Sequence, residues 1–374
     1  MKIEINKKQE KIIIISLIAL IVFSLSFLTI KIAEAPSFFY ENSKKEEKLT
    51  IKQELKPLPE ASAREITLIF TGDIMLSRTV NAKMERYNDY NWPFLKIADF
   101  LNEADLVVGN LESPFLKDAR SYEVLTGSFS FKANPLAIEG LKFANFGLFS
   151  LANNHTINQG QQGIIDTVDI LKENGIKAVG AGLNEEEARR PAIITIEGYD
   201  FAFLAYAYPN DYSIASENRA GIANMDIEKM EKDIELLKTL ENAPDFIVVL
   251  MHAGTEYVLE PNWQQKEFAR SAISAGADMV VGHHPHWPQV FEFYEEKPII
   301  YSLGNFVFDQ MWSEETRQGL LLKMTWQNGI KALELIPTKI YDYGQVEVLE
   351  EGLESSNILK RIKAEDSGLI YEKL

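Results

Sequence analysis

Five short apolar runs in this chain each end in residues that can bind a metal ion or transfer a proton. The runs cover residues 66–70, 106–108, 146–151, 246–251 and 279–281. Carboxylates, carboxamides and imidazoles follow them: Asp73, Asn110, Glu112, Asn153, Asn154, His155, His252 and the cluster from His283 to His286. Such runs are typical of buried strands, and α/β sheets place their chemistry at the carboxyl ends of strands. The five endings therefore predict one shared site.

Three of the five histidines in the chain stand within four positions, at His283, His284 and His286. Gly282 precedes them and allows a sharp turn at the end of the apolar run. In an extended segment alternate residues point the same way, so we expect His284 and His286 to share a site. Neutral imidazole is a common ligand of Zn, Mn and Fe. The cluster favours a metal or catalytic site over solvated loop histidines.

Charge and composition limit the partners and the kind of metal site. The formal net charge of -17 argues against nucleic acid as a partner, and the absence of cysteine excludes disulfides and thiolate ligands. The oxygen and nitrogen ligands at the strand ends suit a divalent transition metal, one or two ions of Mn, Fe or Zn. His155, beside Asn154, is our candidate for the acid that protonates a leaving group.

Helical and strand patterns alternate along the chain, which predicts α/β layering. Apolar residues recur at helical spacing in residues 163–174, 225–240 and 263–275. Two hairpins are expected, over residues 193–204 and 319–336, so the sheets should be mixed. After about Gly344 the sheet pattern is lost. We expect one domain over residues 64–345 and a tail or peripheral helix over residues 346–374.

Residues 1–35 combine early lysines with an uncharged apolar stretch from Ile12 to Ile30 that is long enough to cross a bilayer. The lysines predict a single-pass anchor in the cell membrane, with the N-terminus cytoplasmic and the main domain extracytoplasmic. A cleaved signal peptide is the alternative, because Ala33 and Ala35 form a small-x-small site. A buried soluble helix is the third option. Residues 36–63 mix Glu, Lys, Pro and Ser and are expected to be a solvated linker.

The strand endings also carry a family resemblance. The ordered motifs Gly72-Asp73, Gly109-Asn110-Leu111-Glu112, Asn153-Asn154-His155, His252 and Gly282-His283-His284-Pro285-His286 resemble the calcineurin-like metallophosphoesterases. Longer motifs, which begin at Thr71, Leu151, His252 and Tyr301, resemble more closely the CapA branch of that superfamily, the bacterial poly-γ-glutamate capsule biosynthesis proteins. The resemblance covers about Ile66 to Asp309.

This resemblance implies a four-layer α/β/β/α sandwich with mixed sheets and a site at the strand ends. It implies that Asp73 and His286 hold one metal, and that Asn154, His252 and His284 hold the other. Asn110 or Glu112 would bridge the two ions, and His155 would be the acid. His283 is additional to the pattern of the superfamily.

Two departures weaken the likeness to a phosphoesterase. The superfamily usually has Asp-x-His in its first motif, but Met75 stands at the histidine position, and a thioether is a poor ligand for a hard ion. Asn110 replaces the usual aspartate of the second motif, and a neutral carboxamide bridges cations poorly. Asn158 also stands where the branch often has an acid.

Further residues are candidates for supporting roles. Glu256 and Tyr257 are predicted to bind substrate, or to serve packing alone. His283, Asn305 and Asp309 are predicted to orient the ligating histidines, with ordinary turn chemistry as the alternative for the last two.

Three functions remain open. The first is a membrane-anchored hydrolase or transferase of capsule, poly-γ-glutamate or another cell-envelope polymer. The second is a metal-dependent phosphoesterase. The third is a non-catalytic scaffold that binds the membrane proteins of a capsule synthase.

Overall fold

The computed structural model describes residues 64–118, 129–208, 213–365 and 368–373. The predicted membrane anchor and linker lie outside these residues. Within the described part of the chain, no helix is long and apolar enough to cross a membrane.

The larger of two mixed sheets contains the first three predicted strand runs. Strands β1 (Ile66–Ile74), β2 (Leu106–Leu111), β3 (Phe146–Ser150) and β4 (Lys177–Val179) run parallel to one another. Strand β14 (Gln318–Trp326) pairs antiparallel with β1 and forms the second predicted hairpin with β15 (Ile330–Tyr341). A short strand, β13 (Asn305–Val307), also pairs with β1 near its carboxyl end.

The smaller sheet contains the other two runs. Its central strands β7 (Tyr199–Ala207), β9 (Phe246–His252), β10 (Met279–His283) and β12 (Lys297–Ile300) are parallel. The edge strands β6 (Ala192–Ile196) and β11 (Phe291–Tyr294) are antiparallel, and β6 forms the first predicted hairpin with β7. A separate pair joins β5 (Ala181–Gly182) to β8 (Gly221–Ile222). The prediction of an α/β fold with mixed sheets is confirmed.

Helices form where the spacing of apolar residues predicts them. Helices α5 (Gly160–Glu173), α7 (Ile227–Thr239) and α8 (Trp263–Ala275) cover the three predicted stretches. Helix α8 is delimited by a capping box at its start and by Gly276, at φ 115°, at its end. The remaining helices are α2 (Arg78–Tyr87), α3 (Ala98–Leu101), α4 (Ile138–Phe143), α6 (Glu185–Arg189), α9 (Glu314–Arg317) and α10 (Leu353–Arg361).

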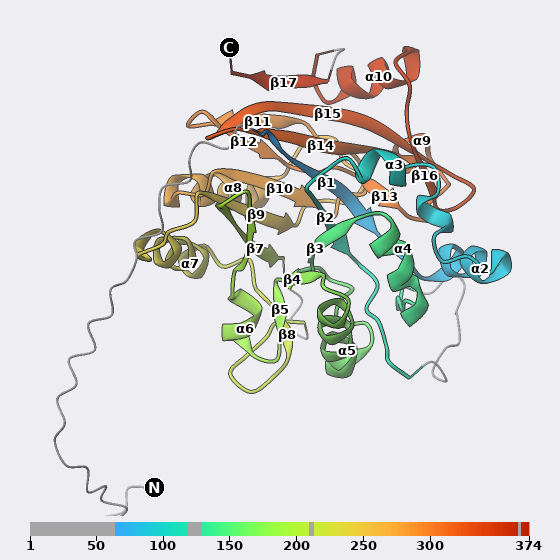
Figure 1. Ribbon diagram of the computed structural model, residues 1–374, viewed down its shortest axis with the longest axis horizontal. Helices are drawn as coiled ribbons and strands as arrows, with labels where there is room; N and C mark the ends of the chain where they lie inside the picture. Colours follow the sequence, from blue (N-terminus) through green and yellow to red (C-terminus); the bar gives the residue numbers. More distant parts are fainter. Residues whose placement is uncertain (1–63, 119–128, 209–212, 366–367, 374) are drawn as a thin grey trace, which may run out of the picture. The chain divides into compact units, whose positions relative to one another are not determined.

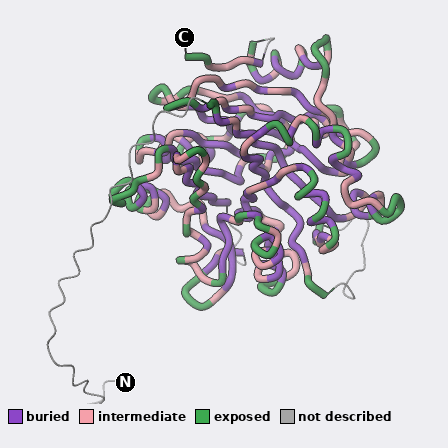
Figure 2. The backbone as a smooth tube through the Cα atoms, viewed as in Figure 1, coloured by how far each residue is buried: buried purple, intermediate pink, exposed green. Residues whose placement is uncertain are grey.

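The two sheets share one core, and alternate residues of the smaller sheet face opposite ways. Phe203 and Val248 pack into the core that contains the larger sheet. Leu204 and Val249 pack instead with α7 and α8. All residues of β9 are buried because both faces of this sheet are covered. The tube in Figure 2 is likewise mostly purple in the interior of the domain. On the larger sheet α4 contacts β3 and α5 contacts β4 (Figure 1).

The expectation that the sheet pattern ends near Gly344 was wrong. Strands β16 (Gln345–Val348) and β17 (Leu369–Glu372) both pair with β15, and the predicted peripheral helix, α10, lies between them. These strands are short, and only Val346 of β16 is fully buried. An edge strand needs few apolar residues. Acidic residues on the exposed side of these strands therefore obscure the alternation of apolar and polar positions in the sequence.

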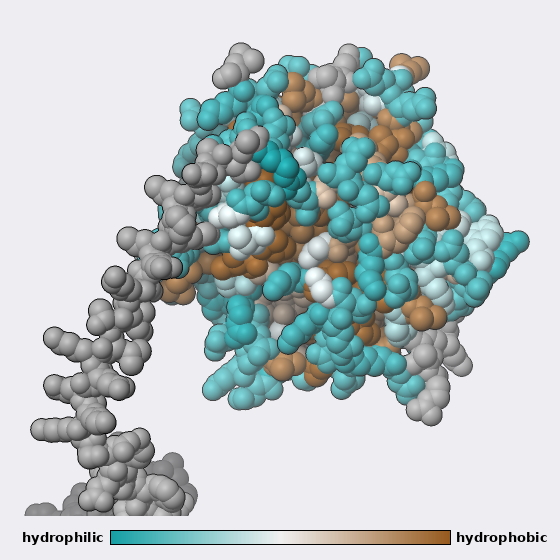
Figure 3. All heavy atoms as spheres, in the orientation of Figure 1, coloured by the Kyte–Doolittle hydropathy of each residue, from teal (hydrophilic) through white to brown (hydrophobic). Residues whose placement is uncertain are grey.

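Apolar side chains that remain exposed are scattered along the chain, for example Leu236, Trp263, Trp312 and Leu353. The face seen in Figure 3 carries many hydrophilic residues, with apolar ones visible between them. Single exposed apolar residues are usual on protein surfaces.

A bulge and a close backbone contact fix the carboxyl end of β1. The register between β1 and β2 shifts between Phe70 and Asp73, which brings Asp73 opposite Asn110. The amide of Asp73 also donates to the carbonyl of Gly304, at 2.9 Å. A Cβ atom on Gly72 would lie 2.0 Å from that carbonyl oxygen. Only glycine allows the two segments to approach this closely.

We therefore expect Gly72→Ala to lower the free energy of unfolding by about 3 kcal/mol, because β13 must move away from β1. Chemical unfolding of the full chain measures this change. Gly352→Ala is the matched control, because the nearest atom to a Cβ at that position is 4.0 Å away. The control should change stability by less than about 0.5 kcal/mol. Equal stability of the two variants would contradict the close contact.

Candidate metal centre

The strand ends of both sheets meet at one place. Asp73 of β1 lies opposite Asn110 of β2, and His283 of β10 lies opposite His252 of β9. The Nε2 atom of His283 lies 3.0 Å from the carbonyl oxygen of Thr71, to which it must donate because that oxygen only accepts. This bond joins the two sheets directly beside Asp73. His283 thus contacts the larger sheet and holds the adjacent histidines next to Asp73.

Asp73 is fully buried among polar groups. Its carboxylate accepts hydrogen bonds from Asn110 Nδ2 at 2.8 Å and from the backbone amide of His284 at 3.2 Å. Nδ1 of His286 lies 3.4 Å from Oδ2, the oxygen that also accepts from the amide of His284. Burial disfavours the charged carboxylate, but the contact with His286 and the nearby imidazoles hold the pKa of Asp73 below its ordinary value. Asp73 is therefore an anion at neutral pH.

Glu112, just past β2, is also fully buried, and its Oε2 atom has no hydrogen-bond partner. Its Oε1 atom lies 3.4 Å from Asn110 Nδ2 and 3.8 Å from His252 Nε2. Burial and the charge of Asp73 raise the pKa of Glu112 well above its ordinary value. A buried carboxyl group with an unpartnered oxygen is what a cation site requires.

Asp73, Glu112 and His286 form a group that could hold a metal ion. One ligand atom from each lies within 4.8 Å of the others, and all three residues are buried. Two carboxylate oxygens and an imidazole nitrogen suit Mn, Fe or Zn. The unpartnered oxygen of Glu112 and this ligand chemistry both fit such an ion.

Asn110 lies between the two carboxyl groups but presents its nitrogen to them. Its Oδ1 atom accepts from Asn153 Nδ2 at 3.2 Å, so the oxygen is already engaged. Asn110 and Glu112 were the two residues predicted to bridge a pair of ions. Of these, Glu112 is the one with a free oxygen.

The second predicted ligand set also comes together. Nε2 of His252 lies 3.0 Å from Oδ1 of Asn154, and the rings of His252 and His284 are 4.8 Å apart between centroids. Burial lowers the pKa of His252 well below its ordinary value and also lowers that of His284. Both imidazoles are therefore neutral, which is the form that binds metals.

The expectation that His284 and His286 alternate along an extended segment was wrong. Strand β10 ends at His283, and both following histidines have positive φ, 98° for His284 and 59° for His286. Non-glycine residues in this region cost energy and occur at functional sites. Their rings are 6.1 Å apart, so the two side chains still lie near each other.

His155 is held in a defined tautomer. Its Nδ1 atom lies 2.9 Å from Oδ1 of Asn158, and that oxygen also accepts from the amide of Phe131 at 2.8 Å. Asn158 Oδ1 is therefore an acceptor, so Nδ1 carries the proton and Nε2 carries the lone pair. The ring stacks on Phe131 at 4.0 Å. Burial lowers the pKa of His155 to about 4, so the imidazole is neutral at pH 7.

The residues predicted to orient histidines have different contacts. Asn305 accepts from Nδ1 of His286 at 2.9 Å, and its own amide donates to the carbonyl of Thr316. The carboxylate of Asp309 instead pairs with Arg78 and accepts from the amide of Thr79. It therefore caps helix α2.

Of the predicted substrate-binding residues, Glu256 is exposed and Tyr257 is partly buried. The ring of Tyr257 stacks near His286 at 6.0 Å and meets the exposed Trp312 edge-on at 4.7 Å. Burial and the neighbouring Glu256 raise the pKa of Tyr257 to about 12, so its hydroxyl keeps its proton.

Sequence reasoning missed Arg78, Phe131 and the link made by Asn153. Arg78 stands five positions after Asp73, where the chain leaves the strand and begins α2. This position, just after a strand that ends in a site residue, was the signal in the sequence that could have identified Arg78.

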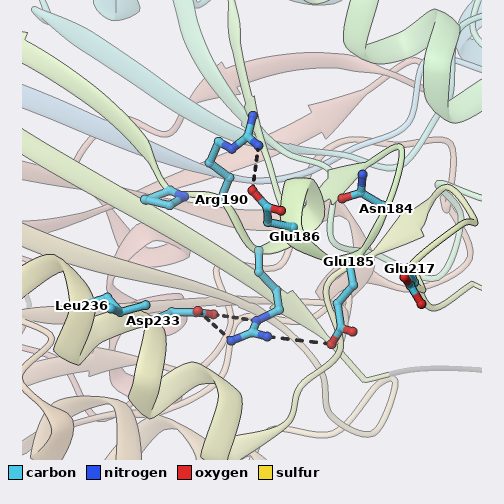
Figure 4. Close-up of a pocket in the computed structure, with 9 residues that line it drawn as sticks. Asn184, Glu185, Glu186, Arg190, Glu217, Asp233 and Leu236 are labelled. Carbon is cyan, nitrogen blue, oxygen red and sulfur yellow. Dashed lines mark hydrogen bonds and ion pairs between the residues drawn. The ribbon is translucent and has the colours of Figure 1, made fainter. Parts of the chain in front are cut away.

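A cleft of about 600 Å³ lies elsewhere, between α6 and α7. Its charged side chains pair with one another, Arg190 with Glu186 and Arg189 with Asp233 (Figure 4). None of the predicted site residues lines it. Because these charges pair with one another, the strand-end group is the better candidate site.

Comparison with known proteins identifies a family. The profile of the bacterial capsule synthesis protein family PGA_cap matches residues 67–310. The capsule biosynthesis protein CapA of Bacillus anthracis is 30% identical over 85% of this chain and 78% of its own length. The PGA biosynthesis protein CapA of Bacillus subtilis (strain 168) is 30% identical over 81% of each chain. Among solved structures, a hypothetical protein from Thermus thermophilus has a TM-score of 0.47 and 13% identity, covering 74% of this chain and all of its own.

The raised pKa of Glu112 predicts how metal binding depends on pH. Below that pKa the carboxyl group is protonated, so a divalent ion must displace its proton, and affinity should rise as the pH rises. Calorimetric titration of Mn²⁺ or Zn²⁺ in two buffers of different ionisation enthalpy should show proton release. Glu112→Gln should lose this release and bind the ion more weakly. Identical heats in both buffers for the native chain would disprove the prediction.

Proposed function

Because the chain belongs to the bacterial capsule synthesis protein family PGA_cap, we propose that it acts on a capsule or cell-envelope polymer such as poly-γ-glutamate. The proposed reaction is metal-dependent hydrolysis or transfer at an amide of the polymer. The observation that carries this proposal is the buried group of Asp73, Glu112 and His286 at the strand ends. The relatives named CapA in two Bacillus species support the choice of polymer.

The arrangement of layers supports the finer fold assignment, a four-layer α/β/β/α sandwich of the metallophosphoesterase kind. The two mixed sheets share a core, and α7 and α8 pack on the outer face of the smaller one. Helices α4 and α5 contact the larger sheet. This order of layers leaves the strand ends of both sheets free to form one site.

We assign two ligand sets. Asp73 and His286 would hold one ion, and Asn154, His252 and His284 would hold a second, with Glu112 between them. The metal is Mn, Fe or Zn, as one or two ions. When bound, it would polarise a carbonyl oxygen and lower the pKa of water. Asn305 fixes the ring of His286 through Nδ1, which leaves Nε2 with the lone pair.

His155 transfers the proton in this proposal. The bond from Nδ1 to Asn158 leaves the Nε2 lone pair as an acceptor, so the resting imidazole first takes a proton from the attacking water. It can then give that proton to the leaving nitrogen of the cleaved amide. The stack on Phe131 holds the ring in place for both transfers. His155 is thus a base before it is an acid.

A phosphoesterase is the second candidate function, and two contacts count against it. Met75 is fully buried, and its sulfur accepts from the backbone amide of Ser77 at 3.1 Å, so it does not act as a ligand. Asn110 presents its nitrogen rather than an oxygen. The first ion would therefore lack the imidazole and the bridging aspartate that a phosphoesterase usually provides. A scaffold role would need neither ion.

The test uses the purified full chain supplied with Mn, Fe or Zn, and it measures cleavage of poly-γ-glutamate and of a phosphate monoester. We expect cleavage of the polymer. His252→Ala and His284→Ala should each reduce it by about a hundredfold or more, because each removes a ligand. Glu350→Ala, an exposed residue beyond β16, is the control and should keep full activity.

Each outcome selects one function. Turnover of the phosphate ester but not of the polymer would favour the phosphoesterase. Wild-type capsule levels in cells that carry His252→Ala would refute catalysis at this site. Retention of capsule synthase membrane proteins by the metal-free chain would then support the scaffold.

We also propose that residues 12–30 anchor the chain in the cell membrane with its main domain outside. Protease added to intact cells should then cut the linker near Glu46 and release the domain, because that segment lies outside the bilayer. Immunoblotting against the C-terminus detects the released fragment. Permeabilised cells are the control, and full protection of intact cells would overturn the orientation.

A further inference from the structure

Arg78 is held beside the candidate metal centre by two aromatic rings. Its guanidinium carbon lies 4.8 Å from the ring centroid of Phe131 and 5.6 Å from that of Phe308. Phe131 stacks on His155 at 4.0 Å, and Phe308 meets His286 edge-on at 4.9 Å. The ring of Phe131 therefore lies between Arg78 and His155, and the ring of Phe308 lies between Arg78 and His286.

The backbone of Arg78 is strained in this position. Its φ angle is 47°, although it is the first residue of helix α2. A non-glycine residue with positive φ costs energy that the surrounding packing must offset. The strain places the side chain between the two rings, with 11% of its surface exposed. Such strain is consistent with a side chain whose position serves the site.

The hydrogen bonds of the guanidinium are incomplete. Nη2 donates to Asp309, which is its one hydrogen bond to a described residue, and Nε is buried without a partner. Asp309 itself also accepts from the amide of Thr79, so its carboxylate is shared. Arginine offers five N–H donors, and unmet buried donors cost free energy. The guanidinium therefore has spare donors next to the site.

The negative charges around the site also favour a cationic side chain for binding an anionic polymer. The anionic Asp73 occupies the centre, the carboxylate of Glu256 acts electrostatically on Glu112 and His284, and the chain as a whole has a net charge of -17. A γ-linked glutamate polymer keeps one free carboxylate per residue, so this field repels it. A guanidinium binds a carboxylate through two parallel hydrogen bonds and offsets that repulsion.

We propose that Arg78 binds a free carboxylate of the polymer and thereby determines the specificity of the site for an anionic chain. The inference rests on the proposed function and names the group that recognises its substrate. Asp309 and the two phenylalanine rings hold the guanidinium ready, so little side-chain entropy is lost when the carboxylate binds.

The test measures binding rather than turnover and uses the full chain in chelator, so that no metal contributes. The probes are a short γ-linked glutamate oligomer and the same oligomer with its α-carboxylates converted to carboxamides. We expect the native chain to prefer the carboxylate form by about tenfold or more. Arg78→Met, which keeps an unbranched apolar side chain at this position but removes the guanidinium, should abolish this preference. Arg78→Lys should keep part of it.

Two checks separate recognition from folding. Arg270→Met removes an arginine that pairs through two 2.8 Å hydrogen bonds with Glu292, away from the site, and should keep the preference of the native chain. Thermal unfolding and metal content of Arg78→Met should match those of Arg270→Met. If Arg78→Met does not fold, the partial preference of Arg78→Lys decides the test.

The outcomes distinguish this inference from the proposed function. If the native chain binds neither oligomer, the polymer assignment fails, and the inference fails with it. If it binds both equally, or if Arg78→Met keeps the native preference, the inference is wrong while the polymer function stands.

Discussion

Two carboxyl groups buried within a few ångströms of each other are the constraint on which the rest of this structure depends. Asp73 and Glu112 are both inaccessible to solvent, and a buried charge is costly unless it is paired. Asn110, the amide of His284 and the ring of His286 stabilise Asp73, but Glu112 retains an oxygen without a partner. A divalent ion is the partner that would satisfy both groups at once.

Holding these groups together requires a rigid frame, and the frame is built from backbone contacts. The bulge in β1 brings Asp73 opposite Asn110, and Gly72 lets β13 approach β1. His283 then joins the sheets through the carbonyl of Thr71. These contacts explain why the chain tolerates positive φ at His284 and His286, because strain at a site persists only where its surroundings fix the geometry.

The sequence predicted those parts of the structure that depend on local pattern. Buried runs identify β1, β2, β3, β9 and β10, and helical spacing identifies α5, α7 and α8, because burial on one or both faces leaves a periodic signal. The left-handed turns at His284 and His286 leave no such signal, since they are imposed by the neighbouring sheet. The pairing of Asp309 with Arg78 could not be predicted either, because the two residues are distant in sequence and Arg78 belongs to no recognisable motif. Which strand ends meet could be predicted, but which side chains pair could not.

Asn110 and Asn154 contribute no charge to the site, and this limits the number of metal ions that it can bind. With Asn110 between them, Asp73 and Glu112 carry at most two negative charges, which one divalent ion balances. The second predicted set, Asn154, His252 and His284, is neutral, because burial keeps the imidazoles unprotonated. A second ion there would take its counter-charge from Glu112 or from a carboxylate of the substrate. Arg78 lies one ring from His155 and would draw that carboxylate toward the site. An anionic substrate would thus supply the negative charge that the site lacks when it holds two divalent ions.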